Sequence, residues 1–225
     1  MSILVKMFTT SKTIFPKGTI FYRSRIYNLS DSTIKKLGYF EQKQYEGFDE
    51  KGSFVNLEAE WPMNGRMNPN GIRVLYVSSD IKTSVREINP SFDELISVAE
   101  IECQEDLKIA DISNIDIEKD DIDLLNYHLY IQDLLSTGYS EKDYIFPQFI
   151  AAYCQNQGFD GIGYRSKFSR KSDKKQKNGI NYTIFNYDKC KAISSKLHIV
   201  RNTTITLKEM EALLPEGFWE KLEKE

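Results

Sequence analysis

Apolar residues recur along the chain with two different spacings, which predict both strands and helices. Alternating or β-branched runs indicate strands over residues 18–26, 72–77, 96–102, 107–112, 159–166, 180–185 and 193–200. Helical spacing with capping signals indicates helices over 31–38, 80–89, from the acidic segment 113–123 to 135, over 147–158, and over 206–224. The polar residues 41–63 are predicted to be loop. The strands can join in an antiparallel or mixed sheet.

The segment 64–90 carries most of the candidate chemistry. Two glycines, a proline and two asparagines surround Arg66 between Gly65 and Gly71, a composition typical of a tight, irregular turn. The turn is expected to present Arg66 on a fixed backbone and to lead into a strand that contains Tyr76. The simplest interpretation is a surface turn followed by a core strand.

A short helix is expected after that strand, capped by Ser79 or Asp80 and carrying Glu87. Its apolar stripe consists of Ile81, Val85 and Ile88, and Ser84 and Glu87 border that stripe. A carboxylate in this position can face a cleft instead of open water, although a solvated helix is the simpler interpretation.

The strand over residues 18–26 contains two arginines. Phe21, Arg23 and Arg25 lie on one of its faces, and Tyr22 and Ser24 lie on the other. The arginines fit a ligand-binding strand, and equally an edge strand whose charges block aggregation.

Composition favours one ordinary folded domain. The 225 residues are 40% hydrophobic, enough for a packed core, and the net charge of −3 argues against a dedicated nucleic-acid-binding protein. With no apolar run of membrane-spanning length and no leader pattern, we expect a cytoplasmic protein without a membrane partner. We predict a single domain over 1–225, with a core of about residues 19–200 and a helical tail of about 206–225.

Cysteine and histidine spacing excludes several chemistries. Cys103, Cys154 and Cys190 are widely separated and fit reduced, structural thiols, and His128 and His198 have no zinc-binding spacing. No Walker A, Rossmann or Gly-x-Ser-x-Gly pattern is present. An enzyme built from this sequence would rely on arginine, glutamate, tyrosine and serine, without a metal.

These residue types suit cleavage of a dinucleotide. Arginine binds pyrophosphate through bidentate, charge-assisted hydrogen bonds. A carboxylate stabilises the oxocarbenium-like transition state that forms when a glycosidic bond breaks. Nicotinamide is a good leaving group, so breaking its bond to ribose in NAD requires neither a metal nor a general acid.

The sequence resembles the RES family, named for an arginine, a glutamate and a serine, over about residues 19–187. The ordered set of matching elements carries the resemblance more than any single element does. The elements are residues 21–26, 65–69 with Gly71, 75–76, Glu87, 159–162 and 164–166. The last element consists of Gly179, Asn181, Tyr182, Ile184 and Phe185.

The resemblance implies an α+β fold like that of ADP-ribosyltransferases, with a split mixed or antiparallel β-sheet core and surrounding helices. It also implies a bacterial toxin that consumes NAD as substrate, with inorganic phosphate as co-substrate and no further cofactor. Such toxins are usually neutralised by a protein antitoxin that blocks the cleft.

Residue roles follow from the same resemblance. Arg23 and Arg66 would bind the NAD phosphates, Tyr76 would lie near the nicotinamide ribose, Glu87 would act on the reacting ribose, and Ser166 would contact the acceptor phosphate. The remaining residues of the expected NAD-binding set are Tyr22, Asn68 and Asn181.

Two other functions fit the same residues. The cleft can transfer ADP-ribose to a protein, as a mono-ADP-ribosyltransferase does, or can bind a nucleotide without catalysis. The lysine-rich segment 167–177 can attract phosphate or an acidic partner, or can be a solvated loop.

Overall fold

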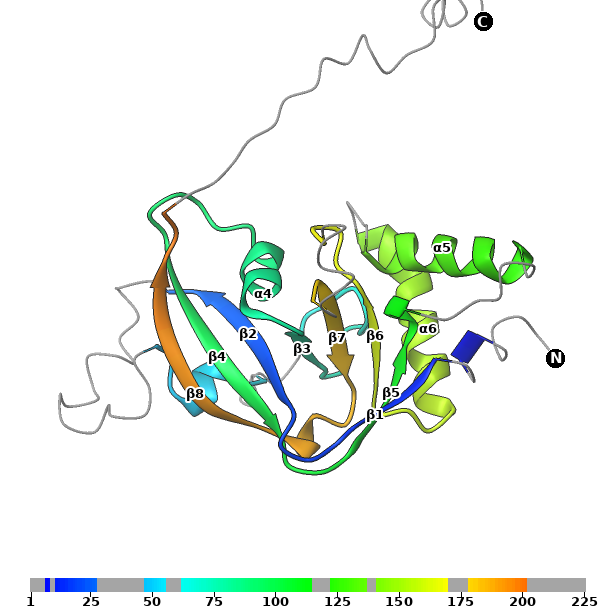
Figure 1. Ribbon diagram of the computed structural model, residues 1–225, viewed down its shortest axis with the longest axis horizontal. Coiled ribbons are helices and arrows are strands. Elements are labelled where there is room, and N and C mark those ends of the chain that lie inside the picture. The colour runs from blue at the N-terminus through cyan, green and yellow to red at the C-terminus, as the bar shows by residue number, and fades with distance from the viewer. Residues whose placement is uncertain are drawn as a thin grey trace, which may run out of the picture.

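An eight-stranded sheet organises the computed structural model, which describes residues 7–8, 11–27, 47–55, 62–114, 122–136, 141–169 and 178–201. Its strands are β1 (Lys12–Phe15), β2 (Ile20–Ile26), β3 (Leu75–Ser78), β4 (Leu95–Cys103), β5 (Leu107–Asp111), β6 (Gly161–Arg165), β7 (Ile180–Ile184) and β8 (Cys190–Ile199). The strand order is β1-β5-β6-β7-β3-β2-β4-β8 (Figure 1). Only β5 and β6 run parallel, so the sheet is mixed but mostly antiparallel.

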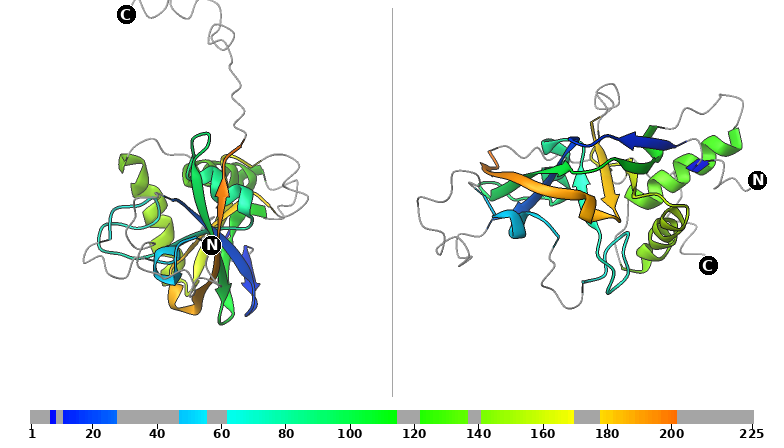
Figure 2. Two further views of the ribbon diagram at one scale, coloured as in Figure 1. Left: turned by 90° about the vertical axis from the view of Figure 1, so that its left-hand side faces the viewer. Right: turned by 90° about the horizontal axis from the view of Figure 1, so that it is seen from below.

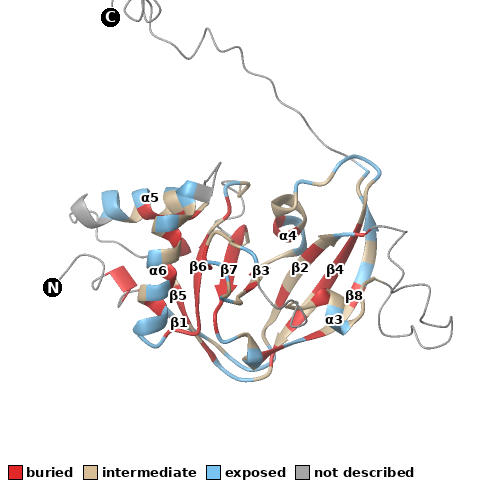
Figure 3. Cartoon of the chain, turned by 180° about the vertical axis from the view of Figure 1, so that it is seen from behind, coloured by how far each residue is buried: buried red, intermediate tan, exposed pale blue. Residues whose placement is uncertain are grey.

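Helices cover both faces of this sheet. They are α3 (Glu50–Ser53), α4 (Ile81–Glu87), α5 (Ile122–Ser136) and α6 (Ile145–Asn156), with 3-10 turns η1 (Ile112–Asn114), η2 (Glu141–Tyr144) and η3 (Tyr187–Lys189). Helix α4 lies over the middle of the sheet, and α3 lies on the opposite face of β2, β4 and β8 (Figures 1 and 3). Helices α5 and α6 lie side by side and both pack against β6 (Figure 2). The predicted α+β fold class is confirmed.

The sheet is almost divided where β2 meets β3. Strand β2 pairs with β4 along all of its residues but with β3 through one pair only, Tyr22 with Ser78. Beyond that pair the two strands diverge, and α4 lies above the gap between them (Figure 1). The sheet therefore continues across this junction through a single residue pair.

Strand β2 is an interior strand, so the edge-strand interpretation of its arginines is wrong. Both side chains reach back to α3: Arg23 Nη1 donates to the carbonyl oxygen of Ser53 at 3.2 Å, and Arg25 Nη1 to that of Gly52 at 2.6 Å. Helix α3 also corrects the prediction of a loop over residues 41–63. At four residues, with an Asp49 cap, it is too short to produce a periodic pattern.

The helix carrying Glu87 forms as predicted, but its buried face is polar. Asp80 caps α4 by accepting a hydrogen bond from the backbone N–H of Thr83 at 2.9 Å. The buried residues are Thr83 and Ser84, whereas Ile81, expected in an apolar stripe, is 39% exposed. The prediction was wrong for Ile81, whereas Val85 and Ile88 are half-buried and Ile88 lines the cavity that α4 covers.

The other predicted strands are confirmed with small shifts of their ends, and β1 was not predicted. Gly161 and Gly163 are explained by strand packing. A Cβ at Gly161 would lie 2.6 Å from the carbonyl oxygen of Thr183, and one at Gly163 would lie 2.6 Å from the ring of Tyr182. These glycines therefore admit the neighbouring strand β7.

Some predicted features lie outside the described residues. They are the helix over 31–38, the acidic residues 115–121, the lysine-rich residues 170–177 and the helical tail over 206–225. The predicted single domain remains a prediction.

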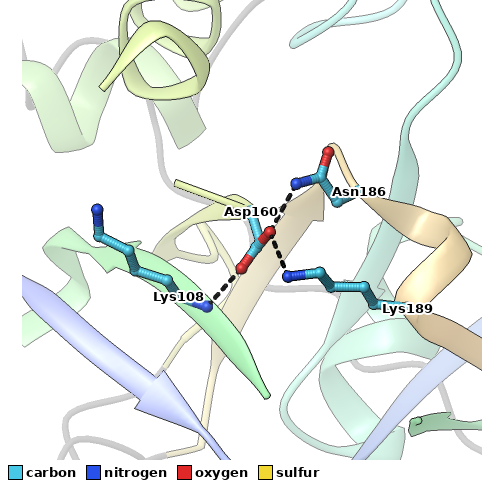
Figure 4. Close-up of polar contacts among 4 residues, drawn as sticks. All are labelled: Lys108, Asp160, Asn186 and Lys189. Atoms are coloured by element: carbon cyan, nitrogen blue, oxygen red, sulfur yellow. Dashed lines mark hydrogen bonds and ion pairs between the residues drawn. The ribbon is translucent and has the colours of Figure 1, made fainter. Parts of the chain in front are cut away.

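Asp160, just before β6, joins three parts of the sheet (Figure 4). One carboxylate oxygen accepts a hydrogen bond from the backbone N–H of Lys108 at 2.8 Å. The other accepts from Asn186 Nδ2 at 2.6 Å and pairs with Lys189 Nζ at 3.0 Å. Burial by itself would raise the pKa of Asp160, but these donors hold it below its ordinary value of 3.8.

We predict that Asp160→Ala lowers the free energy of unfolding at pH 7 by ~3 kcal/mol, because a charged acceptor and its partners are lost. The pKa of Asp160 is lower in the folded state, so its contribution is complete above pH 3.8 and disappears as pH falls through the folded value. Urea unfolding at pH 7 and in acid measures both effects. Asp188→Ala, at an exposed position two residues away from Asn186, is the control. An equal loss at both pH values would contradict the role of the ionised carboxylate.

Candidate functional site

A cavity of about 330 Å³ opens at the β2–β3 junction below α4. Six of the eight predicted site residues line it, drawn from both sides of the junction. They are Tyr22, Arg23, Arg66, Tyr76, Glu87 and Asn181. Of the other two, Ser166 lies behind Glu87, and Asn68 lies within the turn that carries Arg66. The fold thus gathers residues that are far apart in the sequence.

The carboxylate of Glu87, at the end of α4, is held from one side. Its Oε1 accepts a hydrogen bond from Ser166 Oγ at 2.5 Å and another from Asn181 Nδ2 at 2.7 Å. Within the described part of the chain, Oε2 accepts no hydrogen bond. One oxygen therefore anchors the side chain while the other keeps its lone pairs for a ligand.

Two further contacts fix the donors to Glu87. Ser78 Oγ donates to Asn181 Oδ1 at 2.8 Å, so the amide of Asn181 must direct its Nδ2 toward Glu87. Ser166 Oγ accepts a hydrogen bond from the backbone N–H of Phe168 at 3.1 Å. Its hydroxyl proton is donated to Glu87. Ser166 is 3% exposed and does not line the cavity, so it is placed to position Glu87.

Arg66 is fastened to the end of α5. Its Nη1 donates to the carbonyl oxygens of Leu135 and Ser136, each at 2.9 Å. These carbonyls lie in the last turn of the helix, where they lack helical partners and the helix dipole favours a cation. Gln148 of α6 holds the turn itself, because its Nε2 donates to the carbonyl oxygen of Gly65 at 2.9 Å.

The hydroxyl of Tyr76 stabilises the same turn through hydrogen bonds. Its hydroxyl accepts from the backbone N–H of Met67 at 2.9 Å and donates to Asn68 Oδ1 at 2.8 Å. Asn68 Nδ2 in turn donates to the carbonyl oxygens of Met63 and Ile72. Burial raises the pKa of Tyr76 well above its usual range, so the phenol stays protonated and serves as a support.

Arg23 brings a second cation to the cavity from β2. Burial, with a smaller contribution from the neighbouring charge of Arg25, lowers the pKa of Arg23 to about 10. It therefore remains protonated at neutral pH. The cavity is lined by two arginines and by the single carboxylate of Glu87, which suits a ligand carrying both anionic and developing cationic groups.

Several lining residues were not among the predicted site residues. Ser24 and Ser84 lie with their hydroxyl oxygens 2.7 Å apart between β2 and α4. Tyr164, whose pKa burial raises to about 12, belongs to the stretch 164–166 that matched the family pattern. The position of Ser84, three residues before Glu87 on the same helix, was a usable signal. Nothing in the sequence marks Tyr144 as a lining residue.

The chain matches the RES domain family over residues 44–207, well over half of its length, and belongs to that family. The matched range contains Arg66, Glu87, Ser166 and Asn181 but begins after β2. No curated protein matches the sequence. Among solved structures, the chain resembles one from the Mycobacterium tuberculosis MbcT–MbcA toxin–antitoxin complex, with 10% identity, a TM-score of 0.44, and coverage of 89% of this chain and 93% of that chain.

Two kinds of feature are absent from the described segments of the chain. No helix in these segments has the length and apolar character required to cross a membrane. Nor does a group of three or more histidine, cysteine, aspartate or glutamate side chains converge there in a way that could hold a metal ion.

We predict that Tyr76→Phe lowers the free energy of unfolding by about 1–3 kcal/mol, because the substitution leaves the N–H of Met67 and Oδ1 of Asn68 without their buried partner. Urea denaturation at neutral pH measures the loss. Tyr130→Phe, at a position that is 61% exposed, removes the same hydroxyl without a buried partner and is the control. Equal stability of the two variants would mean that Tyr76 does not support the turn.

Proposed function

We propose that this protein is an NAD-consuming enzyme that cleaves the nicotinamide–ribose bond with inorganic phosphate as acceptor, and that it acts as a bacterial toxin. The observation that carries the proposal is the carboxylate of Glu87, anchored through one oxygen and open through the other in a cavity that also holds Arg23 and Arg66. Membership of the RES domain family supports the same chemistry.

The charges of the cavity fit the substrate. The pyrophosphate of NAD is anionic, and guanidinium groups bind such anions through several hydrogen bonds at once. Nη1 of Arg66 is engaged with α5, whereas its Nη2 and Nε make no hydrogen bond within the described residues and remain as donors. A volume of about 330 Å³ is at the lower end for ligand pockets. We therefore expect the cavity to enclose the nicotinamide–ribose end while the adenosine end extends outward.

The reaction needs one charge to be stabilised. As the bond from ribose C1′ to nicotinamide nitrogen breaks, its electron pair leaves with nicotinamide and positive charge develops on the ribose. The open oxygen of Glu87 lies where it can hydrogen-bond a ribose hydroxyl and stabilise this charge. A phosphate oxygen then forms the new bond to C1′, giving nicotinamide and ADP-ribose phosphate.

Ser166 has a different role in this proposal from the one that the resemblance implied. Its proton is directed at Glu87, and its side chain lies outside the cavity lining. Ser166 therefore orients the carboxylate, and the acceptor phosphate would be held by guanidinium groups. Asn181, which lines the cavity, shares this orienting role.

A protein antitoxin that covers the cavity is the partner we propose, and the cytoplasm is the compartment. In the cytoplasm the enzyme would have access to NAD. An antitoxin that covers the cavity would block that access. The MbcT–MbcA complex is described as a toxin bound to its antitoxin.

Incubation of the purified protein with NAD, with and without inorganic phosphate, tests the proposal. We predict loss of NAD that depends on phosphate, with nicotinamide and ADP-ribose phosphate as products separated by chromatography. Label transferred from radioactive NAD to protein would indicate a mono-ADP-ribosyltransferase instead. Unchanged NAD together with measurable NAD binding would indicate a module that binds nucleotide without catalysis.

We predict that Glu87→Gln lowers kcat for NAD cleavage by roughly 10²–10³-fold, because the neutral amide keeps the shape of the side chain but not its charge. The affinity for NAD should change little, as measured by calorimetry. Glu105→Gln, at an exposed position in the β4–β5 turn, removes the same charge away from the cavity and should retain full activity. Retention of kcat by Glu87→Gln would remove Glu87 from the mechanism.

A further inference from the structure

Two of the three cysteines face each other across neighbouring strands. Cys103 is the last residue of β4, Cys190 is the first residue of β8, and the two are direct partners in the antiparallel register. They are 87 positions apart in the sequence (190 − 103), so only the fold brings them together. Both thiols are free.

The backbone hydrogen bonds define the geometry of this pair. Cys103 directs its N–H to the carbonyl oxygen of Thr19 at 2.9 Å, and its carbonyl oxygen accepts from Gly18 at 2.8 Å, so both polar groups point away from β8. Toward β8, the bond runs instead from the N–H of Gln104 to the carbonyl oxygen of Lys189 at 2.7 Å. This pattern makes Cys103 and Cys190 a non-hydrogen-bonded pair.

Non-hydrogen-bonded pairs bring side chains closest together in an antiparallel sheet. Their Cα atoms are about 4.5 Å apart, which lies within the range of about 4.4–6.8 Å found for disulfides. Both side chains also belong to the same buried hydrophobic cluster and therefore lie on one face of the sheet. The strand pairing thus holds the two cysteines at a backbone separation that is compatible with a disulfide.

The chemical environment distinguishes the two thiols. Hydrogen bonding from the Cys190 thiol lowers the pKa of Cys103, whereas the same contact and burial raise the pKa of Cys190. Of the two thiols, Cys103 therefore loses its proton more readily. Cys154 is buried in the other hydrophobic cluster, where burial raises its pKa well above the usual range.

We propose that Cys103 and Cys190 are a site of oxidation at which a hydroperoxide converts the two thiols into an intramolecular disulfide between β4 and β8. In the first step the Cys103 sulfur takes an oxygen from the hydroperoxide, the O–O bond breaks, and an alcohol or water leaves. In the second step the Cys190 sulfur attacks the sulfenic acid, the S–S bond forms, and water leaves. Two thiols are oxidised, and one hydroperoxide is reduced.

The disulfide would lock a specific junction of the fold. Cys190 follows Lys189 directly, and Lys189 pairs with Asp160 just before β6. Strand β4 pairs with β2, which carries Arg23. The bond would therefore join β4 to β8 within the β2–β4–β8 side of the sheet, one residue away from the Lys189–Asp160 contact drawn in Figure 4.

Hydrogen peroxide treatment of the folded full-length protein tests the proposal. After remaining thiols are blocked by alkylation, non-reducing peptide mass mapping should find a linked peptide pair containing Cys103 and Cys190. The link should be absent in Cys103→Ser and in Cys190→Ser but present in Cys154→Ser. The oxidised wild-type protein should also unfold at a higher urea concentration than the reduced protein, and a reductant should reverse this shift.

Other outcomes would overturn the proposal. They include oxidation of the pair to sulfinic or sulfonic acids without a link, disulfides between molecules, and a link that involves Cys154. Circular dichroism of each variant shows whether it is folded, and a variant that fails to fold is replaced by the corresponding Cys→Ala substitution. The assay detects a covalent bond, so its result does not depend on whether the protein cleaves NAD.

Discussion

The double hydrogen bond to Oε1 of Glu87 determines how the central elements must be arranged. A carboxylate that is shielded from water needs polar donors, because its desolvation is costly. Ser166 follows β6, Asn181 belongs to β7, and both must reach the end of α4. The β3–β7 register places Ser78 directly opposite Asn181, which explains how a strand pairing sets the orientation of a side chain in the cavity.

The second constraint is the single residue pair between β2 and β3. A fully paired sheet would have no room at this position, and two separate sheets would not hold Arg23 and Glu87 in fixed relation. One pair keeps the sheet continuous while the strands diverge beyond it. Ser84 and Glu87 of α4 then line the opening, which explains why this helix buries the polar side chain of Ser84.

Local patterns in the sequence were sufficient for most strands and for a helix cap at Ser79 or Asp80, whereas the resemblance to the RES family supplied six of the cavity residues. They did not predict α3, which is too short to show periodicity, or Tyr144, which enters the cavity only through tertiary packing. The role of Ser166 also depends on a contact with a residue 79 positions away, and no local pattern contains that information. For the same reason, the facing of Cys103 and Cys190 became visible only through the strand register.

Arg66 connects the cavity to the outer surface of the protein. Its guanidinium group is bonded to the last turn of α5, and the same helix exposes Tyr127, Leu129 and Tyr130. Any molecule that displaced the end of α5 would move Arg66 as well. Control of the cavity from a distance would thus require no rearrangement of the sheet, only a shift of one helix terminus.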